Sequence, residues 1–328
     1  MRFAKAFLFT ILLFSGFLTV FAQDDDVIKV DASIVRLNVG VVDKTGRPMK
    51  SLTKNDFTLY ENGVKQQIVN FEPVAAPFSV VMMLDMSGST KSFRENIQRS
   101  ALRFLDALSP DDRVAVIEFY DKVNLLNGFT TNRKDIVNSI SVANGKGETN
   151  LYKALKLAMQ KLSKEGKRRK AIVVLTDGVD TEMQKFDRNL LGGFDSTKVN
   201  IEVPTENNEL TKILNQSDAL GVTIYPLALP TGDPARLADP SPKQIAMYSA
   251  ARARLKLLAD RSGGTLNAIN RLEEMSRLYA EVAADLRTLY TIEYQPNDDK
   301  RDGKWREIKI EVNNGELISR TRQGYFAK

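Results

Sequence analysis

Three short segments carry oxygen-bearing side chains whose spacing suits the binding of a cation. They are Asp85-Met86-Ser87-Gly88-Ser89-Thr90, Gly147-Glu148-Thr149-Asn150 and Leu175-Thr176-Asp177-Gly178. Alternate residues of an extended segment project to the same side, so Asp85, Ser87 and Ser89 can converge on one point. Oxygen donors suit a hard cation, and two carboxylates with three neutral hydroxyls roughly balance a 2+ charge. The sequence therefore predicts a divalent-cation site formed by Asp85, Ser87, Ser89, Thr149 and Asp177.

The absence of two residue types narrows the function further. The chain has no His and no Cys. Without His, the usual zinc sites, Ser-His-Asp and Cys-His machinery and imidazole general bases are excluded. Without Cys, an exported protein of this size holds its fold by its core, alone or together with a metal, rather than by disulfides.

The predicted cation-binding segments follow or precede elements of a predicted α/β domain. Continuous apolar runs of strand length occur at 80–84, 114–117, 171–175 and 222–229. Such runs are typical of parallel strands that are covered on both faces. Helical stripes of apolar residues lie between them, at 97–108 and at 151–162, and a further one lies at 272–286. This alternation predicts a doubly wound, mostly parallel sheet over residues 78–288, with the site at the carboxyl ends of its strands.

The segments on either side of this domain alternate apolar and polar residues, as antiparallel strands do. Residues 32–42, and the two runs that flank Glu61-Asn62-Gly63, predict a small N-terminal β module with its linker over 23–77. Residues 289–328 predict a C-terminal β segment, which we expect to join or lie beside that module. Within the α/β domain, residues 181–208 and 230–242 show no period and are predicted to be long surface loops.

The N-terminus has the pattern of a signal peptide. Arg2 and Lys5 precede an apolar run of 16 residues, and Val20-Phe21-Ala22 offers a cleavage site before Gln23. A membrane anchor is the alternative, but this run is shorter than the roughly 20 residues that span a bilayer. We therefore predict a signal peptide over 1–22, export to a periplasm or to the outside, and no membrane span after cleavage.

The charge of the chain gives no indication of nucleic-acid binding. The formal net charge is +6, and two of these charges lie in the predicted signal peptide. The densest basic run, Arg168-Arg169-Lys170, has no interleaved aromatic residues and precedes an apolar strand, which favours a solvated sheet edge.

Taken together, Asp85-x-Ser87-x-Ser89, Thr149 and Asp177 resemble the metal ion-dependent adhesion site of von Willebrand factor type A domains. The whole chain is similar to exported bacterial proteins related to this family, through Leu52-Thr53, Asp56-Phe57 and Glu61-Asn62-Gly63 before the domain, and Tyr290–Tyr294 and Gly324-Tyr325-Phe326 after it. The flanking motifs are less specific than the five-residue site.

The resemblance implies a non-enzymatic function in adhesion or protein–protein interaction. It implies that Ser87, Ser89 and Thr149 coordinate directly, and Asp85 and Asp177 directly or through water. The implied ion is Mg²⁺, with Mn²⁺ or Ca²⁺ as alternatives, and a protein partner supplies an acidic residue to complete its shell. The segment 181–208 is long for such a domain, and we hypothesise that it selects partners or covers the metal with Asp187 or Asp195.

Other interpretations use the same residues differently. A metal-dependent phosphoryl-transfer hydrolase would use Asp85 as nucleophile, but Ser87 stands where enzymes of the haloacid dehalogenase type place their general acid. A Rossmann enzyme would need G-x-G-x-x-G after the first strand, which is absent. A structural module with a degenerate site would gain no stability from a cation. As isolated features, Ser89, Thr90 and Thr149 could be helix caps, and we expect Asp180 and Glu148 to be solvated or to lie behind the ligands.

Overall fold

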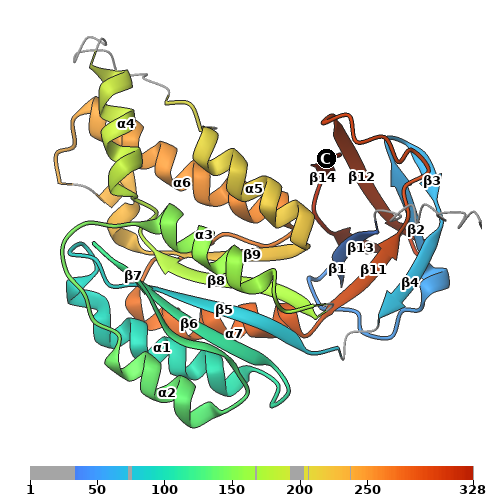
Figure 1. Cartoon of the computed structure of the whole chain (residues 1–328), viewed down its shortest axis with the longest axis horizontal. Helices are drawn as coiled ribbons and strands as arrows, with labels where there is room; N and C mark the ends of the chain where they lie inside the picture. Colours follow the sequence, from blue (N-terminus) through green and yellow to red (C-terminus); the bar gives the residue numbers. More distant parts are fainter. Residues whose placement is uncertain are drawn as a thin grey trace, which may run out of the picture. The chain divides into compact units, whose positions relative to one another are not determined.

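A six-stranded sheet forms the centre of the α/β domain in the computed structural model, which describes residues 34–72, 76–166, 168–192, 203–205, 207–236 and 238–327 (Figure 1). Its strands are β5 (Phe78–Asp85), β6 (Arg113–Phe119), β7 (Val123–Thr130), β8 (Arg169–Thr176), β9 (Val222–Ala228) and β10 (Asn267–Ala268). Their order is β10-β9-β8-β5-β6-β7, and all neighbours run parallel except β7, which is antiparallel to β6. The predicted doubly wound, mostly parallel sheet is confirmed.

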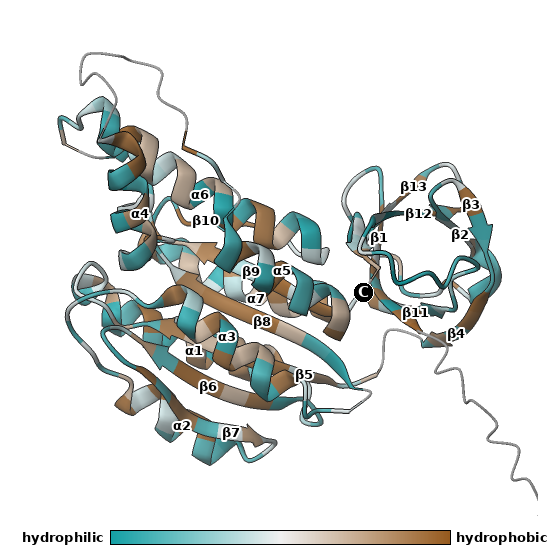
Figure 2. Cartoon of the chain, turned by 45° about the horizontal axis from the view of Figure 1, so that its top comes forward, coloured by the Kyte–Doolittle hydropathy of each residue, from teal (hydrophilic) through white to brown (hydrophobic). Residues whose placement is uncertain are grey.

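Helices cover both faces of this sheet because alternate side chains of each strand point to opposite faces. One apolar cluster joins Val80, Met82 and Leu84 of β5 to α1 (Arg94–Ala107), α2 (Arg133–Val142) and α7 (Met275–Leu286). The other joins Val81 and Met83 to α3 (Leu151–Leu162), α5 (Asn208–Leu220) and α6 (Pro242–Ser262). Figure 2 shows the resulting apolar strands between more polar helices.

An accessory β module is built from both ends of the described chain. One antiparallel sheet has the order β13-β1-β11-β4, and the other has the order β14-β12-β2-β3. The strands are β1 (Val35–Asp43), β2 (Phe57–Glu61), β3 (Val64–Gln66), β4 (Ile68–Glu72), β11 (Leu289–Tyr294), β12 (Trp305–Val312), β13 (Leu317–Arg320) and β14 (Gly324–Phe326), with a short 3₁₀ helix, η1 (Lys54–Asp56). Figure 2 shows them as a ring. The expectation that the C-terminal strands join the N-terminal module is confirmed.

Local chemistry explains the tightest turn of this module. Asn62 and Gly63 connect β2 to β3 with φ of 48° and 77°. Two successive positive φ values are typical of the type I′ turn that closes a two-residue hairpin, and Asn-Gly is the preferred pair there. The hairpin predicted around Glu61-Asn62-Gly63 is therefore present.

The chain leaves the β module to form the α/β domain, and it returns to the module, through two neighbouring strands. β4 ends at Glu72 shortly before β5, and α7 ends at Leu286 shortly before β11. β4 and β11 pair with each other, with Thr291 opposite Glu72. The α/β domain is thus inserted between paired strands, and residues 33–328 group as one compact unit.

The predicted long surface loop over residues 181–208 is wrong in its first part, and its residues 193–202 and 206 lie outside the described residues. Residues 181–191 form a helix, α4 (Thr181–Leu191), because Asp180 caps it by accepting from the backbone N–H groups of Glu182 and Met183. The segment 230–242 contains two 3₁₀ turns, η3 (Pro230–Gly232) and η4 (Pro234–Arg236), and then the first residue of α6. Short 3₁₀ turns lack an amphipathic period, so the sequence pattern missed them.

The basic run is also not a solvated sheet edge. β8 lies in the middle of the sheet, and Arg169 and Lys170 at its start are buried. Arg169 packs over the Phe78 ring at 4.1 Å and donates a 2.6 Å hydrogen bond to the backbone oxygen of Leu289.

In the described residues no helix is long and apolar enough to cross a membrane. The predicted signal peptide lies outside those residues.

Candidate cation site at the carboxyl ends of β5 and β8

Strand order places the candidate residues at a switch point of the sheet. From β5 the chain passes first to β6 on one side and later to β8 on the other. In open α/β sheets, ligands bind in the crevice where the strand order reverses in this way. Asp85 is the last residue of β5, and Asp177 directly follows β8. Both carboxylates therefore lie at the carboxyl ends of adjacent strands.

Asp85 is fully buried and its carboxylate is held from two sides. Its Oδ1 accepts hydrogen bonds from the Ser87 hydroxyl at 2.5 Å and the Ser87 backbone N–H at 3.1 Å. Its Oδ2 accepts one from the Thr176 hydroxyl of β8 at 2.7 Å. Thr90 closes the same turn by donating to the backbone oxygens of Asp85 and Ser87. The hydroxyl of Thr90 therefore orders the loop rather than capping a helix.

Ser89 connects the loop after β5 to the carboxylate of Asp177. The hydroxyl oxygens of Ser87 and Ser89 lie 3.2 Å apart, and the Ser89 side chain hydrogen-bonds the carboxylate of Asp177. Asp177 also accepts from the Val179 backbone N–H at 3.0 Å. Ser87 and Asp177 are buried, whereas Ser89 is exposed. The structure thus brings four of the five predicted side chains into one chain of contacts that opens outward at Ser89.

Thr149 lies on a loop that docks beside the Asp85–Thr90 loop. The Gly88 N–H donates to the Gly147 backbone oxygen at 2.9 Å, which docks this loop on the first one. Gly147 has φ of +87°, and Asp121 accepts from the Glu148 N–H. Thr149 is buried, and its hydroxyl makes no hydrogen bond with the part of the chain that the structure describes. Asn150, not Thr149, is the N-cap residue of α3, so the Thr149 hydroxyl remains available to a ligand.

The site concentrates negative charge from two buried carboxylates. Burial, and then the charge of Asp177, raises the pKa of Asp85 to about 7. Burial likewise raises the pKa of Asp177, against the opposing hydrogen bond from Ser89. Within the described residues neither carboxylate has an ion-pair partner within 4.0 Å. Two buried carboxylates without a cation are costly, which is the electrostatic situation a bound cation would relieve.

The donor set fits a hard cation rather than a transition metal. The candidate ligands are oxygens of Asp, Ser and Thr, as Mg²⁺ and Ca²⁺ prefer. Among residues 34–327 that are described, no cluster of three or more His, Cys, Asp or Glu is placed to hold a metal. A site here therefore depends on the hydroxyls as much as on the two carboxylates.

The acidic residues near the rim have different surroundings. Of the two roles expected for Asp180, the solvated one is excluded, because this residue is buried, caps α4 and accepts from the Tyr152 N–H at 3.2 Å. Glu148 is exposed beside Lys185, as expected of a solvated group. Asp187 cannot cover the metal, because it is buried in a two-point ion pair with Arg254. Asp195 lies outside the described residues.

Three residues near the carboxylates were not predicted. Thr176 links Asp85 to the Gly178 N–H, and its place directly before Asp177 was the available signal. Tyr248 and Arg252 lie one turn apart on α6 and are close enough to Asp177 to feel its charge. No local motif marks these two, because α6 reaches the site only through the fold.

Residues 80–179 match the family model described as the von Willebrand factor type A domain. No curated protein matches the chain.

Three solved structures illustrate the fold likeness. The vWF domain of the type V pili tip protein Mfa5 from Porphyromonas gingivalis is 15% identical, with 64% of this chain and 94% of that chain covered and a TM-score of 0.47. A von Willebrand factor type A structure from Catenulispora acidiphila is 12% identical. The match covers 92% of this chain and 64% of that chain, with a TM-score of 0.49. The pilus adhesin SpaC from Lactobacillus rhamnosus GG, in an open conformation, is 12% identical. The match covers 85% of this chain and 49% of that chain, with a TM-score of 0.47.

Proposed function

We propose that this chain is an exported, non-enzymatic adhesion or interaction protein. It binds Mg²⁺ through Asp85, Ser87, Ser89, Thr149 and Asp177, and it recognises an acidic side chain of a protein partner at this metal ion-dependent adhesion site. Mn²⁺ and Ca²⁺ are the alternative ions.

The observation that carries the proposal is the pair of buried carboxylates without a cationic partner, bordered by hydroxyls. Asp85 and Asp177 are 0% and 2% exposed, and the hydroxyls of Ser87 and Ser89 bridge them. Folding two carboxylates into one crevice costs free energy that a divalent ion would offset.

The proposed partner chemistry follows from the charge of the donor set. When bound, the cation supplies positive charge and a coordination position for an outside oxygen. Ser87, Ser89 and Thr149 are neutral, so they leave the ion attractive to an incoming carboxylate. The exposed Ser89 marks the side from which that carboxylate approaches.

The phosphoryl-transfer alternative is less well supported by the same geometry. Asp85 is 0% exposed, and both of its carboxylate oxygens accept internal hydrogen bonds. A nucleophile would need one oxygen presented to the phosphorus atom. Turnover of an aryl phosphate with Mg²⁺, lost in Asp85→Asn, would support the hydrolase instead.

Cation binding is tested by isothermal titration of Mg²⁺ into the metal-free protein. We expect one site in the wild type and none in Ser87→Ala. Ser89→Ala repeats the test at an exposed residue, where a folding defect is not expected. Ser141→Ala, on α2 and with its hydroxyl on the Val137 backbone oxygen, is the matched control. Equal Mg²⁺ affinity in all four proteins would refute the metal site.

Partner recognition is tested by capture from the native cell envelope with Mg²⁺ and with chelator. Wild type and Ser87→Ala serve as paired baits. We expect specific prey only with the wild type and Mg²⁺. Prey that both baits capture under both conditions would contradict metal-dependent recognition while leaving metal binding intact.

Export is tested separately. N-terminal sequencing of the protein recovered from the cell envelope or medium should give Gln23 as the first residue. Recovery of the uncleaved chain in the membrane fraction would favour the anchor instead.

A further inference from the structure

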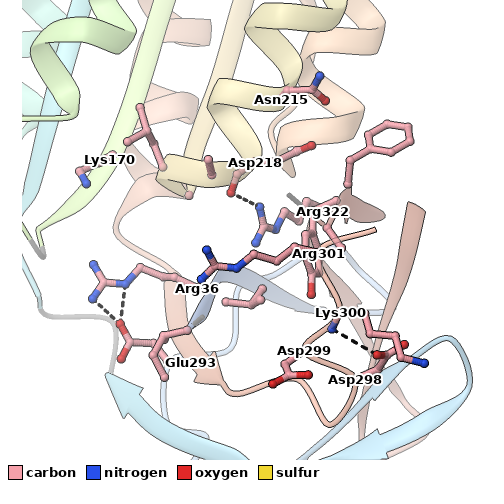
Figure 3. Close-up of a pocket in the computed structure, with 18 of the residues that line it drawn as sticks. Arg36, Lys170, Asn215, Asp218, Glu293, Asp298, Asp299, Lys300, Arg301 and Arg322 are labelled. Atoms are coloured by element: carbon pink, nitrogen blue, oxygen red, sulfur yellow. Dashed lines mark hydrogen bonds and ion pairs between the residues drawn. The ribbon is translucent and has the colours of Figure 1, made fainter. Parts of the chain in front are cut away.

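A second charged cavity lies at the opposite end of β8, between the α/β domain and the β module. Its volume is about 490 Å³, within the range of small-molecule sites. Lys170 at the start of β8 and Leu220 at the end of α5 line it from the α/β domain. Arg36 of β1, Arg301 and Phe326 line it from the β module (Figure 3). Both modules therefore contribute to its walls.

Lys170 is one of the buried cations that line this cavity. It is 7% exposed, yet within the described chain its ammonium group has no hydrogen bond and no ion pair. Burial, and then the positive charge of Arg36, lowers the pKa of Lys170. Glu165 opposes this shift, but it forms no ion pair with Lys170. A largely buried lysine that faces a cavity without a direct acidic partner would be stabilised by an anion that enters.

Arg301 adds a second available cation. It is exposed, and among the described residues it has no acceptor for its guanidinium group. Figure 3 shows it beside Arg36 and Arg322, across the cavity from Lys170. Arg322 is buried and donates to the backbone oxygen of Asp218 near the end of α5, although its Nε has no partner among the described residues. Lys170, Arg301 and the exposed Lys300 are the lining cations whose charged groups have no partner in the described part of the chain.

Most acids that line the cavity are already neutralised. Glu293 pairs with Arg36, Asp218 with Arg261 at 2.7 Å, and Asp298 with Arg306 at 3.4 Å. Asp299 is the one lining acid for which the described residues supply no cation, and it is exposed on the same loop as Arg301. These pairings leave net positive charge on the side of Lys170.

We propose that this cavity binds a small organic phosphate. Lys170 and Arg301 hold the phosphate group, because cations paired with phosphate oxygens form strong, charge-assisted hydrogen bonds. Leu220 and Phe326 offer apolar surface to the organic part. The site is independent of the proposed cation site at the other end of β8.

Binding is tested by isothermal titration of inorganic phosphate and of phenyl phosphate into the full chain, with chelator present and ionic strength held constant with chloride. We expect both probes to bind, phenyl phosphate more tightly because of the apolar wall. Lys170→Met and Arg301→Gln should each weaken binding about tenfold or more, which corresponds to about 1.4 kcal/mol. Arg301 is exposed, so its variant remains informative if Lys170→Met folds poorly.

Two controls separate this proposal from general basicity and from the cation site. Lys156→Gln removes an exposed lysine that pairs with Glu209 on the α3–α5 surface, and it should bind both probes as the wild type does. Ser87→Ala should also bind them normally. Unchanged affinity in Lys170→Met and Arg301→Gln, or an equal loss in Lys156→Gln, would overturn the proposal.

Discussion

The two ends of strand β8 carry buried charge of opposite sign. At its carboxyl end, Asp177 faces Asp85 of the neighbouring strand, and no described cation pairs with either. At its amino end, Lys170 faces a cavity and forms no ion pair with a described residue. Between the two ends the strand is apolar and fully buried. One strand thus presents an anionic site to one side and a cationic site to the other.

The two ends are assembled in different ways. The anionic end is formed by three loops of the α/β domain, which follow β5, precede α3 and follow β8. The cationic end exists only because the β module contributes Arg36 and Arg301 beside the α/β domain. The first is therefore a property of the domain alone, and the second is a property of the insertion of that domain between β4 and β11.

A buried ion pair in the same molecule differs from both ends of β8, because its two charges neutralise each other. Arg254 of α6 and Asp187 of α4 form two hydrogen bonds of 2.7 Å, with side chains 3% and 2% exposed. Arg254 also donates to the backbone oxygens of Pro204 and Thr205. This pair needs no ligand, in contrast to both ends of β8.

The largest effect is expected from breaking that pair. Arg254→Ala leaves Asp187 charged and buried, so the free energy of unfolding should fall by about 3–5 kcal/mol. Chemical denaturation measures the loss. The double variant Arg254→Met, Asp187→Leu should recover most of it, and Mg²⁺ affinity should stay unchanged. A loss below about 1 kcal/mol would show that the pair is not needed for stability.

The anionic end should respond to a cation. At a Mg²⁺ concentration 100 times its Kd, the wild type should gain about 2.7 kcal/mol of stability, because the folded state alone binds the ion. Asp85→Ala should gain nothing. Denaturation with Mg²⁺ and with chelator checks both. A wild type whose stability ignores Mg²⁺ would agree with a degenerate site.

The hydrogen bond that joins the two strands at this end has a smaller expected effect. Thr176→Val keeps the shape of the side chain but removes its donor to Asp85 and its acceptor for the Gly178 N–H. Leaving these groups unsatisfied should cost about 1–3 kcal/mol. Denaturation in chelator isolates this cost from cation binding. Stability equal to the wild type would mean that water replaces the hydroxyl.

The smallest effect is expected at the cationic end. Lys170→Met removes an isolated buried charge, so the anion-free protein should become more stable, by about 1 kcal/mol or less. Denaturation at low ionic strength in chloride measures this change. A clear loss of stability would indicate that the ammonium group already has a favourable partner.

The sequence predicted the central sheet well because continuous apolar strands such as 80–84 and 171–175 give a strong local signal. It also predicted the hairpin at Asn62-Gly63, where backbone conformation restricts residue type. It failed for α4, whose N-cap Asp180 resembled part of a loop. It failed for the basic run as well, because charge count does not reveal that β8 lies in the middle of the sheet.

The sequence by itself determined which residues could bind a cation, since Asp85, Ser87, Ser89, Thr149 and Asp177 have the required oxygens at strand and helix boundaries. Only the tertiary structure decided which charges are neutralised. It joined Asp187 to Arg254 and left Asp85, Asp177 and Lys170 without ion-pair partners among the described residues. The physical reason is that residue type fixes a charge, whereas burial and distant partners, set by packing, fix its energetic consequence.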